Sequence, residues 1–378
     1  MKQEVFQITH KDKKSNARIG ILNTKSGSVE TPFFMPVATK AAAKFITTPQ
    51  IKEIGANVTI SNAFILSLKP GTKIIKKMKG LNKFMNHHGV TFTDSGGFQM
   101  YSESIYQSSN DMGVKFRNPI SGEKIFMTPE QNMQIQLDIN SDVAMCLDSM
   151  PLYEDSKESI KESARKTTLW AKRCKETHDK LQKRIPKNKK QLLFGITQGG
   201  VYPDLREQSI KELAELDFDG YSIGGMGMGE KWEEEAKVVQ LQKSILPENK
   251  PIYLMGIGHP IEILNGISEG VDIFDSRLPT QNARRGTLFT SKGRLRLLNK
   301  KHEFSKKPID KNCNCQVCQN YTRSYLRHLL NQQEPLGKQL ATYHNLYFLT
   351  NLIKQAKQEI KKGTFNKFKN KFIKNYKD

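Results

Sequence analysis

The sequence predicts an α/β protein built on a closed (β/α)₈ barrel, the TIM-barrel architecture. Three observations lead to this prediction: eight short runs are rich in strand-forming residues, helical stretches lie between them, and the runs end in small or polar residues. Strands that alternate with helices form a parallel sheet, because each helix returns the chain to the same edge. Eight strands close such a sheet into a barrel, and a doubly wound open sheet is the alternative.

The expected barrel strands are short, and most are separated by enough chain for a helix. They cover residues 34–39, 57–62, 90–97, 143–148, 192–200, 220–225, 252–258 and 271–276. Clear helical stretches between them are 154–184, 205–216 and 232–245. Ahead of the first run, residues 20–31 have the pattern of a hairpin, which we expect to cap one end of the barrel.

The pattern changes after the eighth run. Residues 287–299 alternate like a hairpin, a cluster of cysteines follows, and helical periodicity returns near Leu336. We therefore expect three parts. They are a barrel with its hairpin cap over 1–286, a zinc-binding insertion over 287–344, and a final helix with a basic tail that packs on the barrel over 345–378.

The composition is strongly basic, with 60 Lys and Arg against 38 Asp and Glu and a formal net charge of +22. Such a charge attracts polyanions through phosphate neutralisation, so nucleic acid is the leading partner, although a generally lysine-rich proteome would give the same balance. In the tail, lysines surround four aromatic residues at helical spacing, so its lysine face is either solvated or in contact with RNA. The four are Phe365, Phe368, Phe372 and Tyr376.

Other composition features bear on the compartment. Hydrophobic residues make up 37% of the chain, and no window approaches the roughly 18 apolar residues of a membrane span. The first residues lack the pattern of a secretory signal, so we expect a cytoplasmic protein with no membrane partner. Three of the five cysteines, Cys313, Cys315 and Cys318, crowd together, which favours metal binding over disulfides. The separate Cys146 and Cys174 are expected in the core.

Polar residues end several of the expected strands, and in this fold the carboxyl ends of the strands form the active site. Asp94, Asp148, Gln198 and Asp275 would all lie on that rim, next to a glycine-rich loop over 224–229. Capping of the following helices is the ordinary alternative for each aspartate. Carboxylates are unexpected in a polyanion binder unless they face an uncharged group, such as a base or an anomeric carbon.

Two of these carboxylates suit substitution at a sugar carbon with retention. One group attacks the anomeric carbon while the other moves the proton of the leaving group, and Asp275 and Asp94 are the candidates. The glycine-rich loop could cradle a phosphate, but its methionines favour a wall around a flat aromatic ring.

Four motifs stand out along the chain: Asp94-Ser95-Gly96-Gly97-Phe98-Gln99, Gly195-Ile196-Thr197-Gln198-Gly199-Gly200, Tyr253-Leu254-Met255-Gly256-Ile257-Gly258, and Phe274-Asp275 with Leu278-Pro279-Thr280. In order and in spacing, they resemble the signatures of the queuine/archaeosine tRNA-ribosyltransferases (tRNA-guanine transglycosylases). The resemblance extends over about 31–344 and includes the three clustered cysteines with His344, which look like the structural zinc site of the family. His328 is the competing fourth ligand. A closed Cys3His site holds zinc for stability, not for catalysis.

The resemblance implies a role for each site residue. Asp275 would be the nucleophile and Asp94 the general acid and base. The base would be read by Asp148, Gln198 and the Gly225 backbone. Further contacts would come from stacking residues and from the acidic residue beside the 7-substituent, at Phe98, Met255 and Glu230. Walls that stack on the ring and hydrogen bonds at its edge are how a flipped base is held.

The chain departs from the family pattern at several places. Gln281 stands where an arginine usually follows Leu-Pro-Thr, Arg284 is kept, and Arg277 replaces a small apolar residue; these three are the expected RNA contacts. Met150 and Met228 are larger than the residues that usually size the base pocket, which favours a compact incoming base.

The expected activity is exchange of the wobble guanine in tRNAs with a GUN anticodon for a free 7-deazaguanine, in queuosine biosynthesis. 7-Aminomethyl-7-deazaguanine is the favoured base and queuine the alternative. We expect no archaeal-type C-terminal extension, which favours the anticodon over the D-loop, and the resemblance implies a homodimer. A non-catalytic RNA-binding subunit and an enzyme acting on DNA are the other interpretations.

Overall fold

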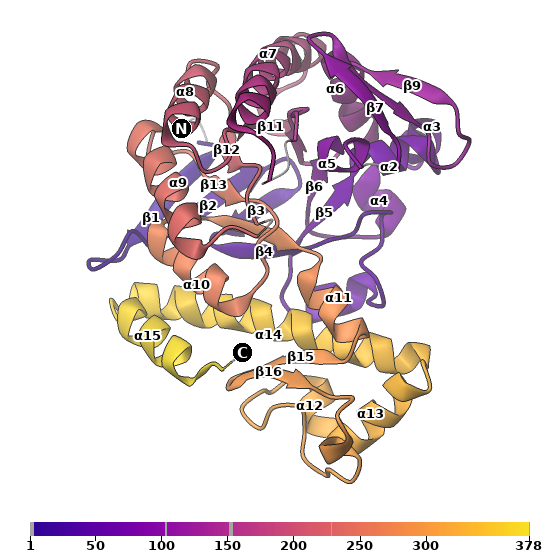
Figure 1. The fold of residues 1–378 in the computed structure, drawn as a ribbon, viewed down its shortest axis with the longest axis vertical. Coiled ribbons are helices and arrows are strands. Elements are labelled where there is room, and N and C mark those ends of the chain that lie inside the picture. Colours follow the sequence, from indigo (N-terminus) through magenta and orange to yellow (C-terminus); the bar gives the residue numbers. More distant parts are fainter. Residues whose placement is uncertain (1–3, 103, 151–153, 228, 378) are drawn as a thin grey trace.

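The barrel is present in the computed structural model, which describes residues 4–102, 104–150, 154–227 and 229–377, and of Phe98 the backbone alone (Figure 1). Its strands are β4 (Phe33–Pro36), β5 (Val58–Asn62), β6 (Val90–Asp94), β10 (Val143–Met145), β11 (Leu192–Thr197), β12 (Gly220–Ile223), β13 (Ile252–Leu254) and β14 (Ile273–Ser276). They pair in parallel in the order β4-β14-β13-β12-β11-β10-β6-β5. A parallel bridge between Val37 and Ile60 closes the ring. The predicted TIM barrel is confirmed, and the open sheet is wrong.

All eight predicted runs overlap a barrel strand, but most of the strands stop before the predicted end. β10, for example, ends at Met145, whereas the run extends to residue 148. The polar residues at the ends of the runs therefore belong mainly to the loops that leave the strands. In a barrel of this kind, those loops carry the chemistry.

Aromatic side chains fill the barrel below these loops. The Phe92 ring meets Phe33, Phe194 and Tyr253 edge to face, with centroids 6.3, 5.7 and 6.4 Å apart. Side chains two residues apart on a strand share one face, so Asp94 follows Phe92 towards the barrel axis. The same alternation places Asp275 above the buried Ile273 on β14. Hydrophobic residues inside the strands thus aim the carboxylates at their carboxyl ends.

Helices cover the outside of the barrel. The three predicted helical stretches are α7 (Lys157–Leu181), α8 (Pro203–Ala214) and α9 (Trp232–Ile245). The others that flank the barrel are α1 (Thr48–Glu53), α2 (Ala63–Leu68), α3 (Thr72–Lys77), α4 (Leu81–Met85), α5 (Gly97–Met100), α6 (Pro129–Ile139), η1 (Lys187–Lys189), α10 (Pro260–Glu269) and α11 (Leu278–Arg284). In α7, residues at spacings of three and four are buried, including Ile160, Ala164, Trp170 and Cys174, as expected for a helix with one face on the barrel.

The predicted hairpin before the barrel is part of a three-stranded antiparallel sheet. It consists of β1 (Phe6–Lys11), β2 (Arg18–Thr24) and β3 (Gly27–Glu30), and β1 was not predicted. Arg18 forms a buried ion pair of 2.6 Å with Asp272, which lies just before β14. The sheet is therefore fixed at the amino end of the strands, opposite the predicted active site.

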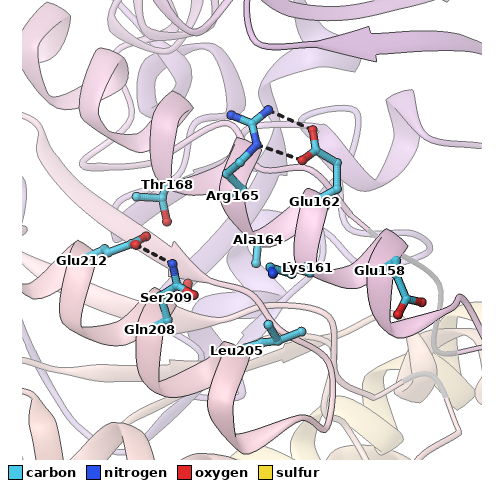
Figure 2. A pocket seen from close by; sticks show the side chains of 10 residues that line it. All are labelled: Glu158, Lys161, Glu162, Ala164, Arg165, Thr168, Leu205, Gln208, Ser209 and Glu212. Carbon is cyan, nitrogen blue, oxygen red and sulfur yellow. Dashed lines mark hydrogen bonds and ion pairs between the residues drawn. The ribbon is translucent and has the colours of Figure 1, made fainter.

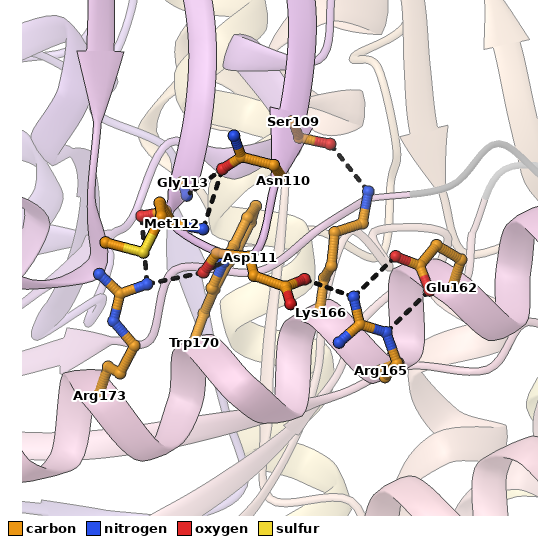
Figure 3. Close-up of polar contacts among 10 residues, drawn as sticks. All are labelled: Ser109, Asn110, Asp111, Met112, Gly113, Glu162, Arg165, Lys166, Trp170 and Arg173. Atoms are coloured by element: carbon orange, nitrogen blue, oxygen red, sulfur yellow. Dashed lines mark hydrogen bonds and ion pairs between the residues drawn. The ribbon is translucent and has the colours of Figure 1, made fainter.

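A second small sheet, which the sequence did not predict, lies between β6 and α6. Its strands are β7 (Tyr106–Asn110), β8 (Gly113–Arg117) and β9 (Lys124–Met127). Helix α7 holds its first turn, as Figure 3 shows. Trp170 Nε1 and Arg173 donate to the carbonyl oxygen of Asp111 at 3.0 and 2.7 Å, and Lys166 Nζ donates to Ser109 Oγ at 2.9 Å. The turn is therefore anchored to the barrel wall.

The C-terminal part contains the predicted hairpin and the cysteine cluster. Its elements are β15 (Thr287–Thr290), β16 (Gly293–Arg296), η2 (Lys300–His302), α12 (Gln316–Asn320), α13 (Arg323–Asn331), α14 (Pro335–Lys361) and α15 (Phe365–Asn375). The long helix α14 lies between the barrel and the hairpin (Figure 1). Asn345 in α14 donates to the carbonyl oxygens of Pro279 and Thr287 and accepts from the Phe289 amide. Further along, Lys357 and Lys361 pair with Glu30 of the N-terminal sheet.

The basic tail packs its aromatic face on the body, as one of the two interpretations expected. Phe365 and Tyr376 are buried, and Phe368 and Phe372 pack partly buried against the main core. The lysines between them are half-buried or exposed. None of the described helices is long and apolar enough to cross a membrane.

Candidate active site

Three carboxyl groups gather at the carboxyl ends of β6, β10 and β14. Asp94 ends β6, Asp148 follows β10, and Asp275 lies in β14. Burial, together with the charges of Asp148 and Asp275, raises the pKa of Asp94 to about 7, while the amides of Ser95 and Gly96 oppose the shift. Groups that repel each other in this way are close in space. At neutral pH, Asp94 is therefore divided between its acid and its base form.

The two oxygens of Asp275 differ in their hydrogen bonds to the described residues. Oδ1 accepts a hydrogen bond of 2.6 Å from the Tyr253 hydroxyl and one of 3.0 Å from the Gly256 amide. Within the described part of the chain, no group donates to Oδ2. Burial raises the pKa of Asp275, and the two hydrogen bonds oppose this. A carboxylate oriented by two donors, with one bare oxygen, suits a nucleophile.

Tyr253 is a site residue that was not predicted, because a tyrosine inside an apolar strand is usually a core residue. Burial, with the charge of Asp275 next, raises its pKa well above the usual value, so its hydroxyl stays a donor. The following Gly256 has a φ of +82°, which turns its amide towards Asp275. The Tyr-Leu-Met-Gly segment thus supplies both donors, and its place in a motif was the available signal.

Asp148 and Gln198 form a buried pair on the other side of the rim. Gln198 Nε2 donates to Asp148 Oδ2 at 2.8 Å. Burial raises the pKa of Asp148 to about 6, and the bond from Gln198 opposes this. Gln198 Oε1 is buried and has no partner among the described residues. A buried amide oxygen without a donor is costly, so this atom is available to a ligand.

Glycines surround this pair closely. A methyl group on Gly97 would lie 2.5 Å from Asp148 Oδ1. A methyl group on Gly224 would lie 2.6 Å from Gln198 Nε2, and one on Gly225 would lie 2.5 Å from Oε1. Gly225 also has a φ of +68°. The glycines of the rim therefore let the backbone approach the Asp148–Gln198 pair, as a site for a flat ligand requires.

Asn62 is a second site residue that was not predicted. Its Nδ2 donates to Asp94 Oδ2 at 3.3 Å and to Gln99 Oε1 at 2.7 Å, while its Oδ1 caps α2 through the Ile65 amide. From the outside, Asn132 of α6 donates to the Ser95 carbonyl at 2.9 Å. The Asp94 loop is thus fixed from both sides.

The remaining predicted pocket residues are placed as follows. Met255 follows β13 and is half-buried. Met150 is half-buried, with its sulfur 3.7 Å from Gln198 Nε2, so it borders the pair. Glu230 is half-buried after the glycine-rich loop. Met228 lies outside the described residues; Phe98 has its backbone in α5, and its side chain lies outside the description as well.

The predicted RNA contacts lie around α11, immediately after Asp275. Arg277 is exposed, and Gln281 faces Arg285. With the Gln281 amide turned so that its oxygen faces the guanidinium group, that oxygen accepts from both terminal nitrogens at 3.2 Å. Arg284 is half-buried, and burial, assisted by Arg285, lowers its pKa. The position beside the rim suits contact with groups that flank a bound nucleotide.

The three clustered cysteines and His344 form a buried group whose ligand atoms all lie within 4.8 Å of one another. His344 Nδ1 is 3.9, 3.4 and 3.4 Å from the sulfurs of Cys313, Cys315 and Cys318. Tetrahedral zinc with its usual bond lengths requires N to S edges of about 3.5 Å. The group can therefore hold a metal ion and fits zinc. His328, the alternative ligand, is exposed on α13 outside this group and is wrong.

A second contact orients the histidine ligand. The other ring nitrogen of His344, Nε2, lies 2.8 Å from the Phe289 carbonyl oxygen, which fixes Nδ1 as the atom that faces the sulfurs. No ligand position is left over for a substrate. Cys146 and Cys174 are buried free thiols in the core, as predicted.

Two grooves lie away from the rim. One, of about 230 Å³, runs between α7 and α8 and is lined by charged and polar residues such as Glu158, Arg165 and Gln208 (Figure 2). The other, of about 710 Å³, lies between α14 and the amino ends of the barrel strands. Neither groove is lined by the carboxylates of the rim, so the candidate active site rests on the residues at the ends of the strands.

Comparison with known proteins agrees with this arrangement. The family model described as queuine tRNA-ribosyltransferase matches residues 12–378. The queuine tRNA-ribosyltransferase of Lysinibacillus sphaericus is 44% identical over 371 residues, covering 98% of this chain and 96% of that protein. The protein of the same name from Bacillus subtilis is 43% identical, covering 98% of this chain and 96% of that protein. The one from Staphylococcus aureus strain JH9 is 45% identical, covering 96% of this chain and 94% of that protein. The chain belongs to the queuine tRNA-ribosyltransferase family and is a pentosyltransferase enzyme.

Proposed function

We propose that this enzyme replaces the wobble guanine of tRNAs with a GUN anticodon by a 7-deazaguanine, through a covalent bond between Asp275 and the ribose. The observation that carries the proposal is the state of Asp275. Tyr253 and Gly256 hold one of its oxygens, and the other is bare. In the first step, Oδ2 attacks the anomeric carbon and the bond to guanine breaks, with its electron pair leaving on the base. In the second step, the incoming base attacks the same carbon and Asp275 departs.

Asp94 moves the proton in both steps. With a pKa of about 7, it gives a proton to the leaving guanine and takes one from the incoming base without a large penalty in either direction. Asn62 holds Asp94 Oδ2 at 3.3 Å, so the proton-transfer group has a fixed orientation. Asp94 then returns to its starting state after each exchange.

The Asp148–Gln198 pair and the Gly225 amide read the base, with Met255 and Phe98 against its faces and Glu230 beside the 7-substituent. The bare Gln198 Oε1 supports this, because an amide or amine of a base would supply the missing donor. The cations that contact the RNA are the exposed Arg277 before α11 and the half-buried Arg284 at its end, with Gln281 between them. The high net charge supports an RNA partner.

The metal is a structural zinc ion, held by the Cys3His group. Zinc supplies four strong bonds to a segment with a small core of its own, and it takes no part in the transfer. We further propose that the enzyme works in the cytoplasm as a homodimer. A non-catalytic subunit is disfavoured, because a degenerate subunit would have lost some of the site residues, and this chain keeps them all: Asp94, Asp148, Gln198 and Asp275.

The incoming base is the compact 7-aminomethyl-7-deazaguanine, since Met150 borders the pair and fills space that the added ring of queuine would require. Competition against incorporation of labelled guanine decides between them. Stronger inhibition by queuine than by the aminomethyl base would contradict this choice, and Met228→Val would then change the ranking little.

The exchange itself is tested with labelled guanine and either bulk tRNA or DNA. We expect acid-precipitable label when the protein is incubated with tRNA, and none when it is incubated with DNA. Without incoming base, the wild-type protein should also carry a tRNA adduct on a denaturing gel, and Asp275→Asn should carry none. Exchange at the wild-type rate by Asp275→Asn would show that another group is the nucleophile.

A further inference from the structure

Arg206, in the first turns of α8, is a fully buried cation that lies behind the base-reading loops. In the described chain, no carboxylate forms an ion pair with it. Its three hydrogen bonds go to backbone carbonyl oxygens instead: Nε to Gly200 at 2.7 Å, and the two terminal nitrogens to Thr197 at 3.0 Å and Gly224 at 2.8 Å. Burying a charge in this way is expensive, so its position requires an explanation beyond packing.

The carbonyl partners of Arg206 belong to the two loops that carry the proposed base contacts. Thr197 and Gly200 flank Gln198, and Gly224 precedes Gly225. One guanidinium group therefore fixes the positions of both Gln198 and Gly225. Its planar fork can reach three carbonyls in fixed directions, which a lysine ammonium on a flexible stem does not do.

The contact to Gly224 has a further effect, because its carbonyl and the Gly225 N–H belong to the same peptide group. Donation to the carbonyl oxygen polarises that peptide and makes its N–H a stronger donor. The guanidinium also lies close behind this peptide, since a methyl group on Gly225 would be 3.7 Å from the Arg206 nitrogen. Burial lowers the pKa of Arg206 to about 9, which Glu230 opposes, so the group keeps its charge at neutral pH.

We propose that Arg206 is a positioning residue that acts through the Gly224–Gly225 peptide to strengthen the hydrogen bond to the 6-carbonyl oxygen of the purine. When the glycosidic bond breaks, its electron pair passes into the base and part of the charge reaches that oxygen. A stronger Gly225 donor stabilises this charge. The inference rests on the proposed function, because it requires Gly225 to contact the base.

The experiment compares two inhibitors of labelled guanine incorporation: unlabelled guanine, and 2-aminopurine, which lacks the 6-oxygen. The wild-type protein should prefer guanine. In Arg206→Gln, guanine should inhibit roughly tenfold less well. Inhibition by 2-aminopurine should weaken by a clearly smaller factor, because that base still uses the Gln198 loop that Arg206 also holds, and the KM for tRNA should stay nearly constant. In Arg206→Lys, inhibition by guanine should be intermediate between that of the wild-type protein and that of Arg206→Gln. The control is Gln208→Ala, an exposed position of the same helix whose side chain bonds to Glu212.

The outcomes of this comparison distinguish two effects of the substitution. If Arg206→Gln only loosens the loops, both inhibitors should weaken equally, and the proposed action through the Gly224–Gly225 peptide would be overturned. An unchanged preference for guanine in both variants would also overturn it, and if Arg206→Gln does not fold, Arg206→Lys gives the same comparison. Failure of the wild-type protein to incorporate guanine would instead contradict the proposed function.

Discussion

At the scale of single residues, the site depends on how burial sets the charge of its carboxyl groups. The pKa of Asp94 rises from 3.8 to about 7, that of Asp148 to about 6, and that of Asp275 rises as well. A carboxyl group with a raised pKa favours its neutral form in the folded protein. The charged form that Asp275 needs for attack therefore lowers the free energy of unfolding. Activity and stability are therefore opposed at this rim.

Asp94→Asn tests this opposition. A carboxyl group with a raised pKa binds its proton more tightly in the folded state, so it lowers the free energy of unfolding as the pH rises from about 4 towards 7. The variant should therefore gain roughly 2–4 °C in Tm at pH 8 and little at pH 4. Its exchange rate should fall by about 10²- to 10⁴-fold.

Thermal unfolding across this pH range measures the effect, with exposed Asp179→Asn on α7 as the control. A variant that is less stable than the wild type at pH 8 would show that Asp94 is stabilised as a carboxylate, against the direction of its pKa.

At the scale of elements, the sequence predicted those features that have a regular period. The barrel strands are apolar runs with a polar end, and Asp94 and Asp275 could be placed because they stand at the polar ends of two of these runs. The sheet of β7, β8 and β9 was missed because its strands mix polar and apolar residues without a clear alternation, as in Tyr106–Asn110. Tyr253 and Arg206 were missed because their partners, a carboxylate and three carbonyls, come from other elements.

Gly97→Ala tests the close approach of α5 to the base-reading pair. The new methyl group would be 2.5 Å from Asp148 Oδ1, so either the helix or the carboxylate must move. We expect the KM for guanine to rise roughly tenfold or more, with a smaller change in the KM for tRNA. Gly122→Ala has no atom within 4 Å of its new methyl group and should leave both constants unchanged. An unaffected KM for guanine in Gly97→Ala would place the base elsewhere on the rim.

At the scale of the whole molecule, the metal group shares no residue with the rim but is central to the C-terminal part. His344 lies within α14, and its second ring nitrogen contacts the Phe289 carbonyl in β15. The metal would therefore join the cysteine loop, the hairpin and the long helix at one point. Sequence spacing identified the cysteines, but the choice of His344 over His328 depended on the resemblance and on the fold.

Cys315→Ser should lower the zinc content of the purified protein and its Tm together, because a structural site that loses one of four ligands binds metal more weakly. Asn314→Ser, its exposed neighbour, is the matched control. Metal analysis and thermal unfolding of the two variants provide the measurement. A metal-free Cys315→Ser protein with wild-type Tm and activity would rule out a structural role.

Helix α14 also determines how the molecule comes apart. Along its 27 residues, it supplies His344 to the metal group, Asn345 to the α11 and β15 backbone, and Lys357 to the N-terminal sheet. Elements joined through one continuous helix cannot lose their structure independently without breaking that helix. Calorimetry should therefore give a single transition whose van't Hoff and measured enthalpies agree. The molecule would then unfold as one cooperative unit, although its sequence divides into parts.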